Sequence, residues 1–220
     1  PTLHHSVIVI VSVDCDTVQG VIINKPLGVR MADSVSSASS EWVAPLASSQ
    51  LYRGGDVSQQ QLVVFHQVAG LESSLQVSKG LWATSNVREL AATLKSIVER
   101  GPPTSGHLAV KCAAGYAGWD RQQLQSEIDR NVWFLAAPDT CKGVAQLVLL
   151  EQPAQFDEAS GQWLRDTIWA GAVSQLSRTH SEFERLARFP GDGHLVWQHV
   201  ADAWKQQAEA LKSRLESMPS

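Results

Sequence analysis

The sequence predicts an α+β protein that carries a helical extension at its C-terminal end. Three observations favour this class. Short runs of β-branched residues, such as VIVIVSV at residues 7–13, are typical of buried strands. The segment that follows Asn86 has the apolar spacing of an amphipathic helix. From about Asp157 the sequence becomes helical in character, so a mixed body is followed by a two-helix appendage.

The strands are expected mainly in the first two thirds of the chain. Residues 7–13 form the first, and residues 20–26 form its partner, which Pro26 ends because proline cannot donate a hydrogen bond to a ladder. The Ser/Ala-rich residues 34–49 are expected to form a loop or a weak helix. Further strands are predicted at residues 62–66, 108–116 and 146–150.

The helix after Asn86 is the clearest element in the sequence. Asn86 is a suitable N-cap, and Glu89 stands three residues later, as in a capping box. The apolar residues of this helix form one stripe, and Gly101 with the two following prolines ends it. In the appendage, helices are expected at residues 163–189 and 195–218, separated by a break at residues 189–193.

The segment GYAGWD, residues 115–120, is expected to turn and then to open a second helix. Gly115 and Gly118 permit the bend, and Asp120 caps the helix while Gln123 reaches back to the cap. The apolar side of this helix would be formed by Leu124, Ile128 and Leu135. Two interpretations of Trp119 remain open. Its side chain either packs in the core at the start of the helix or stacks against a ligand, and we favour core packing.

Composition and charge argue against nucleic-acid binding and leave protein partners open. Of the 220 residues, 44% are hydrophobic and 18% are charged, and the formal net charge of −4 gives no attraction to polyanions. The basic residues are dispersed among acidic ones, as on a solvated helix face. Eight tryptophans favour a contact surface, since tryptophan is enriched where proteins meet.

No metal site, cofactor site or membrane span is expected from the sequence. Cys15, Cys112 and Cys141 share no short spacing, and we expect buried free thiols in a reducing compartment. The seven histidines form no metal-binding motif. No apolar run approaches the ~20 residues that span a membrane. The chain opens at Pro1 within an apolar run and has no initiator methionine, so its start is expected to be processed or truncated.

The candidate functional residues fall into two sets, and neither is catalytic. Gly54 and Gly55 lack the further residues of a phosphate-binding loop, and we expect a turn with positive φ there. A pocket for a small molecule would require the motif residues Asn24, Gly54, Gly55 and Trp119 to converge. The second set is a stripe on the last predicted helix that packs either on the core or on another protein: Trp197, Trp204, Leu211 and Leu215.

Several motifs, taken in order, resemble those of one family, the AlgH/YqgE-like proteins. They are SVIVIV, GVIINKP, YRGGDV, the VFH of LVVFH, the GL of KGLW, and GYAGWDRQQLQSEIDRNVWFLAAP. The resemblance covers residues 1 to about 176, and residues 177–220 form the extension. This chain departs from the family pattern at Asp56, where proline is usual, and at residues 120–122, where the family often has Gly-Pro-Gly before Gln-Leu. The family usually opens with a further strand upstream, and that strand is expected to be missing from this chain.

The resemblance implies a compact α+β domain in which a strongly coiled or bifurcated sheet packs against helices. The family has no established catalytic residues, so none is carried over to this chain. Relatives in plants and algae are directed to plastids, and a plastid location is therefore predicted, with mitochondrion and bacterial cytoplasm as alternatives.

Three functions are compatible with the sequence. The first is a non-catalytic interaction module, an accessory or assembly subunit of a larger protein complex, including a complex at a membrane surface. The second is a small-molecule-binding protein or an enzyme of unknown reaction. The third is a transcription regulator, as the family name suggests, although that function needs a basic surface that this sequence does not offer.

Overall fold

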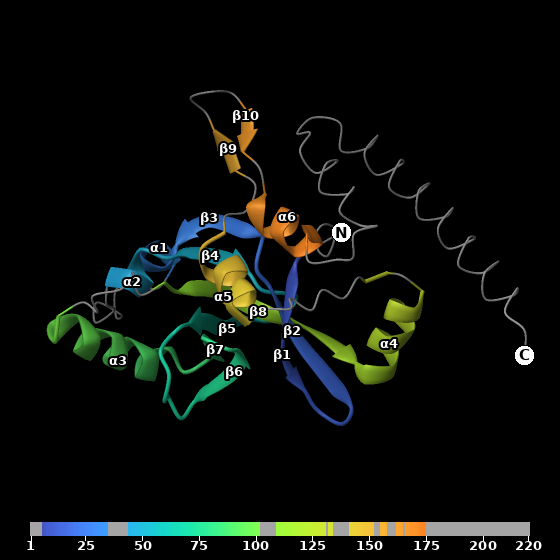
Figure 1. The fold of residues 1–220 in the computed structure, drawn as a ribbon, viewed down its shortest axis with the longest axis horizontal. Coiled ribbons are helices and arrows are strands. Elements are labelled where there is room, and N and C mark those ends of the chain that lie inside the picture. The colour runs from blue at the N-terminus through green and yellow to red at the C-terminus, as the bar shows by residue number, and fades with distance from the viewer. Residues whose placement is uncertain are drawn as a thin grey trace, which may run out of the picture.

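The computed structural model describes residues 6–34, 44–101, 109–130, 132–133, 141–151, 155–157, 162–164 and 166–174 (Figure 1). Eight strands form one sheet: β1 (Ile8–Val13), β2 (Thr17–Ile22), β3 (Pro26–Arg30), β4 (Gln50–Arg53), β5 (Val57–His66), β6 (Ser74–Ser78), β7 (Leu81–Thr84) and β8 (Lys111–Asp120). A separate antiparallel pair consists of β9 (Gln155–Asp157) and β10 (Gln162–Leu164). The helices are α1 (Met31–Ser34), α2 (Ala44–Ala47), α3 (Val87–Glu99), α4 (Arg121–Asp129), α5 (Cys141–Leu149) and α6 (Thr167–Ser174).

Strand β8 organises the sheet because it pairs with three other strands. It runs antiparallel to β5 and parallel to β4 in its first half, and its last four residues pair with β2 instead. The main strand order is β1-β2-β8-β5-β7-β6, and β3 joins through β4. The end strands β1 and β6 also contact each other, so the sheet is strongly curved and nearly closed. The α+β class with a coiled sheet is therefore confirmed.

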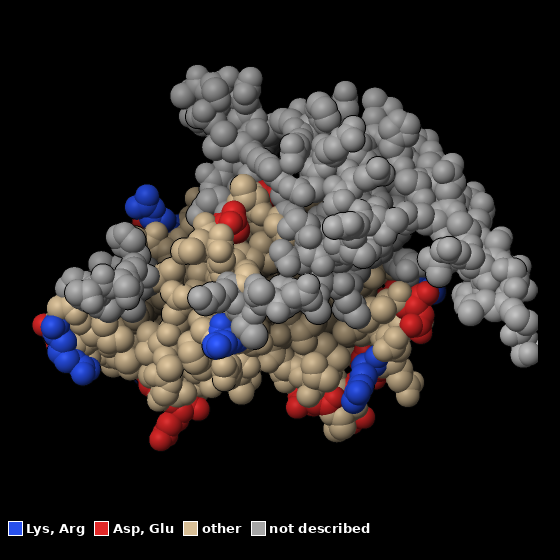
Figure 2. All heavy atoms as spheres, viewed as in Figure 1, with Lys and Arg blue, Asp and Glu red and all other residues tan. Residues whose placement is uncertain are grey.

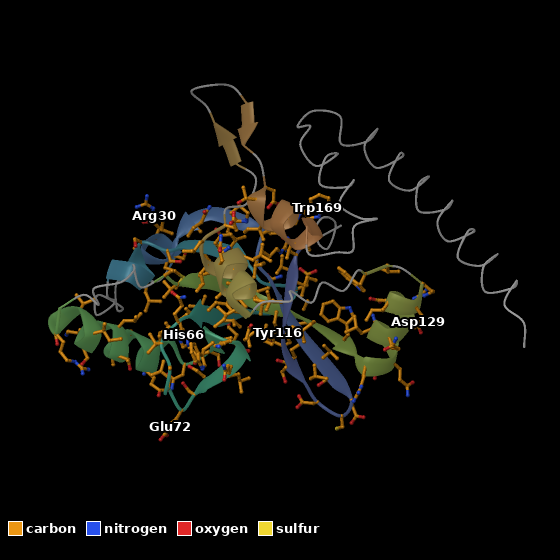
Figure 3. The ribbon with its side chains drawn as sticks, viewed as in Figure 1. Arg30, His66, Glu72, Tyr116, Asp129 and Trp169 are labelled. Atoms are coloured by element: carbon orange, nitrogen blue, oxygen red, sulfur yellow. The ribbon has the colours of Figure 1, made fainter. Side chains whose placement is uncertain are left out.

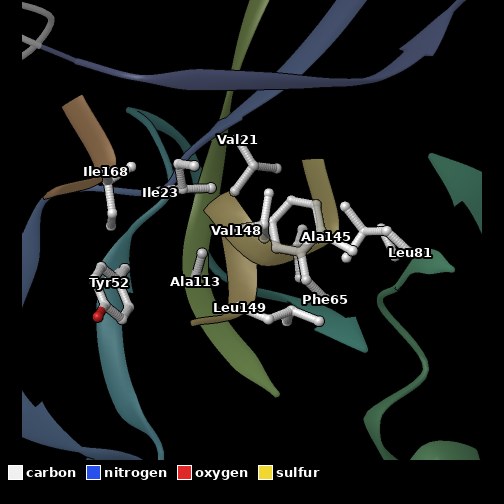
Figure 4. Close-up of a cluster of buried hydrophobic side chains, with 12 residues drawn as sticks. Val21, Ile23, Tyr52, Phe65, Leu81, Ala113, Ala145, Val148, Leu149 and Ile168 are labelled. Carbon is white, nitrogen blue, oxygen red and sulfur yellow. The ribbon is translucent and has the colours of Figure 1, made fainter. Parts of the chain in front are cut away.

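The side chains of the central strands alternate between two hydrophobic cores. On β5, Phe65 faces one core while Val64 faces the other, as a period of two residues requires. Neighbours on β8 divide in the same way, with Ala113 in the first core and Cys112 in the second. Helices α5 and α6 cover the first core (Figure 4), and α1, α2 and α3 supply the second. Each fully buried Leu, Ile or Phe in these cores contributes about 2 kcal/mol.

The two predicted helix caps are present. Asn86 Oδ1 accepts from the Glu89 amide of α3 at 3.3 Å, and Asn86 Nδ2 donates to the Glu89 carboxylate at 3.2 Å. Asp120 Oδ1 accepts from the amides of the second and third residues of α4 at 2.8 and 3.3 Å. The prediction that Gln123 reaches back to the cap is wrong, because its side chain bonds forward to Glu127 at 2.9 Å.

Residues 146–150 were predicted as a strand, and the structure places them at the end of helix α5 and in the turn after it. A short apolar run fits either element, and its packing decides which one forms. Ala145, Val148 and Leu149 lie three and four residues apart, so the helix turns all three into the first core.

Other element boundaries differ from the predictions. Residues 20–26 divide between β2 and β3, and Pro26 begins an edge strand where it was expected to end one. The predicted strand at 108–116 begins at Lys111 and continues to Asp120, so GYAGWD lies within β8. The predicted helix at 163–189 is also wrong at its start, since residues 162–164 form β10 and the helix begins at Thr167. Residues 177–220, with their predicted helices, lie outside the described residues.

Candidate functional site

Gly54 and Gly55 lie where the chain passes between β4 and β5, pressed against β8. The prediction of a turn with positive φ is wrong for both of them; Gly115 on β8, at +74°, is the positive-φ glycine nearby. A Cβ at Gly54 would lie 2.2 Å from the Gly115 carbonyl oxygen, and one at Gly55 would lie 2.0 Å from the Tyr116 carbonyl carbon. Glycine is therefore required here by the close approach of two backbones.

Asn24 lies at the end of β2, next to these glycines, and is almost completely buried. Its Oδ1 accepts from the Val7 amide at 2.8 Å, and its Nδ2 donates to Asp166 Oδ2 at 3.1 Å. The neighbouring backbone is tied to the glycine segment, because Gly54 O accepts from Ile22 N at 2.8 Å. The Asn24 side chain thus links its own segment by hydrogen bonds to two distant segments, those of Val7 and Asp166.

Trp119 lies at the other end of β2, opposite Val18. Its side chain is only 6% exposed, and its ring meets the Trp133 ring edge-on, with centroids 5.8 Å apart. This burial supports the interpretation that the Trp119 side chain packs in the core. The structure therefore groups Asn24 with Gly54 and Gly55 but places Trp119 elsewhere along the strand. Ligand binding by this set of four residues stays a prediction.

A buried polar cluster lies on the same face as Asn24, and the sequence predictions missed it. Lys111, at the start of β8, is 4% exposed, and its Nζ donates to Ile23 O at 3.2 Å. The same ammonium lies 4.5 Å from the centre of the Tyr52 ring, a cation–π contact. The signal in the sequence was a single lysine inside the apolar strand LAVKCAAGY.

The carboxylates of two acidic residues affect the pKa of Lys111. Burial lowers the pKa of Lys111 to about 8, against the opposing effect of the Asp166 and Glu151 carboxylates, which favour its charged form. Burial also raises the pKa of Asp166, although hydrogen bonds from Trp169 N and Asn24 and the charge of Lys25 act in the other direction. Tyr52, buried beside them, has its pKa raised to about 12, mainly by desolvation.

Asp166 connects the cluster to helix α6. Its Oδ1 accepts from the Trp169 amide at 2.8 Å, so the carboxylate caps the helix that Figure 3 shows around Trp169. The next residue but one, Ile168, is fully buried in the first core. The carboxylate thus holds the start of α6 close to Asn24 and the two lysines.

His66 and Ser74 are 3.0 Å apart, yet they do not form a catalytic pair. The Val68 amide donates to His66 Nδ1 at 3.2 Å, which leaves the proton of the neutral ring on Nε2. His66 therefore donates to the serine hydroxyl and cannot take its proton, as a general base must. Burial lowers the pKa of His66 to about 4, so the ring is neutral at physiological pH.

The described cysteines differ in exposure. Cys112 is buried, and desolvation raises the pKa of its thiol to about 11, as expected for an inert core thiol. The prediction of buried thiols is wrong for Cys15, which is exposed in the β1–β2 turn. Within the residues that the structure describes, no group of three or more His, Cys, Asp or Glu side chains could hold a metal ion. The stripe Trp197, Trp204, Leu211 and Leu215 lies outside these residues.

Charges on the described surface are scattered. In Figure 2, lysine, arginine, aspartate and glutamate appear singly or in small groups of mixed sign on a largely uncharged face. Across the described part of the chain, no helix is long and apolar enough to cross a membrane.

A nearly closed, coiled sheet with helices over both of its hydrophobic faces defines an α+β protein organised around one central strand, here β8. A family model described as AlgH-like matches residues 1–156. The chain belongs to this AlgH-like family.

Curated relatives agree with this assignment, and two solved structures are similar to this chain. The chain is 33% identical to a UPF0301 protein of Methylococcus capsulatus over 151 residues, which cover 68% of this chain and 75% of that protein. It is 24% identical to a UPF0301 protein of Bacteroides thetaiotaomicron over 189 residues, 86% and 81% of the two chains. A crystal structure from Corynebacterium diphtheriae shares the fold, with a TM-score of 0.52, 20% identity and 80% of each chain covered. The solution structure of AlgH from Pseudomonas aeruginosa is also similar, with a TM-score of 0.48, 22% identity and coverage of 67% and 72%.

Proposed function

We propose that this protein is a non-catalytic interaction module, an accessory or assembly subunit that binds an extended segment of another protein along strand β3. The observation that carries this proposal is the exposure of two large apolar side chains on that strand. Leu27 is 45% exposed and Val29 is 41% exposed, two positions apart.

The hydrogen-bonding pattern of β3 also favours an added strand. Among the described residues it pairs with β4 alone, through Pro26 opposite Tyr52 and Arg30 opposite Gln50. The backbone of Leu27 and Val29 lies between these two pairs, where the ladder is irregular. An edge strand with exposed apolar side chains tends to pair with another chain unless it is protected. Strand addition satisfies the backbone groups and buries the apolar side chains together.

Other exposed apolar side chains are weaker candidates for the contact. Val98 on α3 and Val132 after α4 stand alone, and single exposed apolar residues are common on protein surfaces. Ile10 and Val13 on β1 and Leu75 on β6 belong to the two strands that contact each other where the sheet nearly closes. Strand β3 is thus the favoured docking edge.

The test compares partner capture by three full-length proteins that carry an affinity tag. These are the wild type, the double variant Leu27→Ser/Val29→Ser, and the matched control Val98→Ser, which removes an equally exposed valine from α3 (49%). The wild type and the control should retain one partner from native extract, and the double variant should lose it. Circular dichroism verifies that each protein is folded.

Equal retention by all three proteins would reject β3 as the docking edge. Size-exclusion chromatography with light scattering tests a second outcome. A wild-type dimer that the double variant disperses would make the occupant a second copy and contradict the assignment to a different protein. The variant Trp204→Ala/Leu211→Ala tests in the same assay whether the C-terminal stripe contributes to docking.

We propose a plastid as the location, on the strength of the resemblance to plastid-directed relatives. Imaging the protein, expressed from its complete coding sequence as a fluorescent fusion in the cells of its source, tests this location, and fluorescence outside plastids would contradict it.

A further inference from the structure

Two positively charged side chains flank the exposed apolar pair of strand β3. Lys25 comes just before the strand and Arg30 ends it, so Leu27 and Val29 lie between two cations. A segment that docks along β3 comes close to both charges. Whether each cation already has an acidic neighbour within the protein therefore indicates which charge the segment should carry, and where.

At the start of β3, the protein supplies its own acidic groups. Lys25 is partly buried, and burial lowers its pKa against the opposing effect of the Asp166 carboxylate, which favours the charged form. Arg53 of β4 lies beside Lys25, because its amide donates to Lys25 O at 2.8 Å. The guanidinium of Arg53 is paired in turn, with Nη2 3.4 Å from Asp56 Oδ1. This end of the strand therefore needs no charge from a partner.

The guanidinium of Arg30, at the other end of β3, has no acidic partner among the described residues. Its side chain is exposed, and Figure 3 shows it at the edge of the molecule beside α1. Asp33 stands three positions later and forms no ion pair with it. The backbone at this point is held in place, since Arg30 pairs with Gln50 of β4 and Arg30 O accepts from Ser34 Oγ at 2.9 Å. The guanidinium thus presents its N–H donors at the same edge as the two exposed apolar side chains.

A strand added to β3 places one of its residues opposite Arg30. Cross-strand pairs of opposite charge stabilise a sheet, and like charges directly opposite destabilise it. Arginine also binds carboxylates in a planar, bidentate arrangement. Asp or Glu is therefore favoured at this position, and Lys or Arg is disfavoured. Because Val29 and Arg30 are neighbours, the residue opposite Arg30 is the neighbour of the residue that meets Val29.

We propose that the segment bound by β3 carries an Asp or Glu directly beside the two apolar residues that meet Leu27 and Val29, and that Arg30 pairs with its carboxylate. This inference rests on the function proposed for β3 and adds the chemistry of the partner. The segment is acidic at the end that reaches Arg30 and needs no charge at the end that reaches Pro26. The apolar pair provides the contact, and Arg30 discriminates among apolar segments by their charge.

Peptide selection tests the inference. A phage-displayed library of random linear peptides is selected on the full-length wild type, on Arg30→Glu, on Arg30→Gln and on the control Arg88→Glu, which reverses an exposed charge on α3. Wild type and control should select two apolar residues, two positions apart, with Asp or Glu beside them. Arg30→Gln should lose the acidic preference, and Arg30→Glu should select Lys or Arg at the same position. Circular dichroism verifies that each variant is folded.

The affinity of one selected peptide measures the size of the effect. In fluorescence anisotropy at low salt, a peptide selected on the wild type should bind Arg30→Glu about fivefold more weakly. Replacing the acidic residue of the peptide by Lys should restore binding to Arg30→Glu and weaken binding to the wild type. Added salt should reduce both differences, because it screens an exposed ion pair.

Selection and binding on Leu27→Ser/Val29→Ser separate this inference from the function on which it rests. Peptides that require Leu27 and Val29 but show no acidic preference would overturn the inference and leave β3 as the docking edge. An acidic preference that persists on Arg30→Glu would overturn it equally. If no selected peptide loses binding in Leu27→Ser/Val29→Ser, the docking edge itself is rejected, and the inference is rejected with it.

Discussion

At the scale of single residues, Gly54 and Gly55 show how backbone packing fixes sequence. Both have φ values outside the positive region, so their conformation alone does not require glycine. The requirement comes from β8, whose carbonyl groups occupy the space that a side chain would need. The YRGGDV motif is therefore explained by the contact between the glycine segment and β8, and no bound phosphate is needed to explain it.

Gly54→Ala should destabilise the protein by about 3 kcal/mol, because the added methyl group would overlap the Gly115 carbonyl and force two strands apart. The matched control is Gly118→Ala on β8, where the nearest atom to a new Cβ is 3.6 Å away and φ is not positive. The control should lie within about 0.5 kcal/mol of the wild type. Urea denaturation measures both changes, and equal destabilisation of the two variants would contradict the packing argument.

At the scale of elements, local chemistry decided where helices begin, and tertiary contacts decided which type of element forms. Asn86 and Asp120 cap α3 and α4 as their sequences indicate. The apolar run at the end of α5 was assigned to a strand. The helix forms because its spacing turns Ala145, Val148 and Leu149 onto the sheet together.

Asp120→Ala should destabilise the protein by about 1 kcal/mol, since the amides of Gln122 and Gln123 lose their acceptor at the start of α4. Asp120→Asn keeps an oxygen at the cap and should recover most of that loss. Asp129→Ala, at the opposite end of the same helix, is the control. Removing a negative charge from a helix C-terminus should be neutral or slightly stabilising. A loss of stability in Asp129→Ala as large as that in Asp120→Ala would contradict a specific capping role.

At the scale of the whole molecule, the sheet separates two cores, and each contains a buried ionisable side chain. Lys111 lies with Phe65 and Tyr52 on the face that α5 and α6 cover. His66 alternates with Phe65 along β5 and lies on the opposite face, with Val64. Burial on either face disfavours the charged form, so the pKa of each base is lowered.

The lowered pKa of His66 predicts that acid destabilises the protein. The folded-state pKa is about 4 and the ordinary value is 6.5, so between these values the unfolded chain binds a proton that the folded protein excludes. The stabilising contribution is fully present above pH 6.5 and is lost as the pH falls towards 4, with a total on the order of 3 kcal/mol.

The variant His66→Gln isolates this contribution from that of the carboxyl groups, which titrate in the same range. The difference in unfolding free energy between wild type and variant should shrink as the pH falls from 7 to 5. Urea denaturation at several pH values measures this difference. A difference that stays constant across the range would contradict a neutral, buried His66.

Much of the fold was accessible from the sequence because its signals are local. The β-branched runs, the cap at Asn86 and the apolar stripe of α3 each depend on neighbours a few residues away. The strands β6 and β7 were missed because they are short, although SLQVS in β6 alternates polar and apolar residues. Asn24 was named as a candidate, but its partner Asp166 is too distant in sequence for any local pattern to pair them.

The sequence by itself determined the α+β class, the membership of the AlgH-like family that the ordered motifs indicate, and the caps of α3 and α4. Those features depend on local backbone geometry and side-chain chemistry. Only the tertiary structure decided that residues 146–150 belong to a helix and its following turn, that Gly54 and Gly55 serve a backbone contact, and that Lys111 and Asp166 share one buried cluster. These features depend on segments that the curved sheet brings together, and their energy comes from burial and charge between residues far apart in the chain.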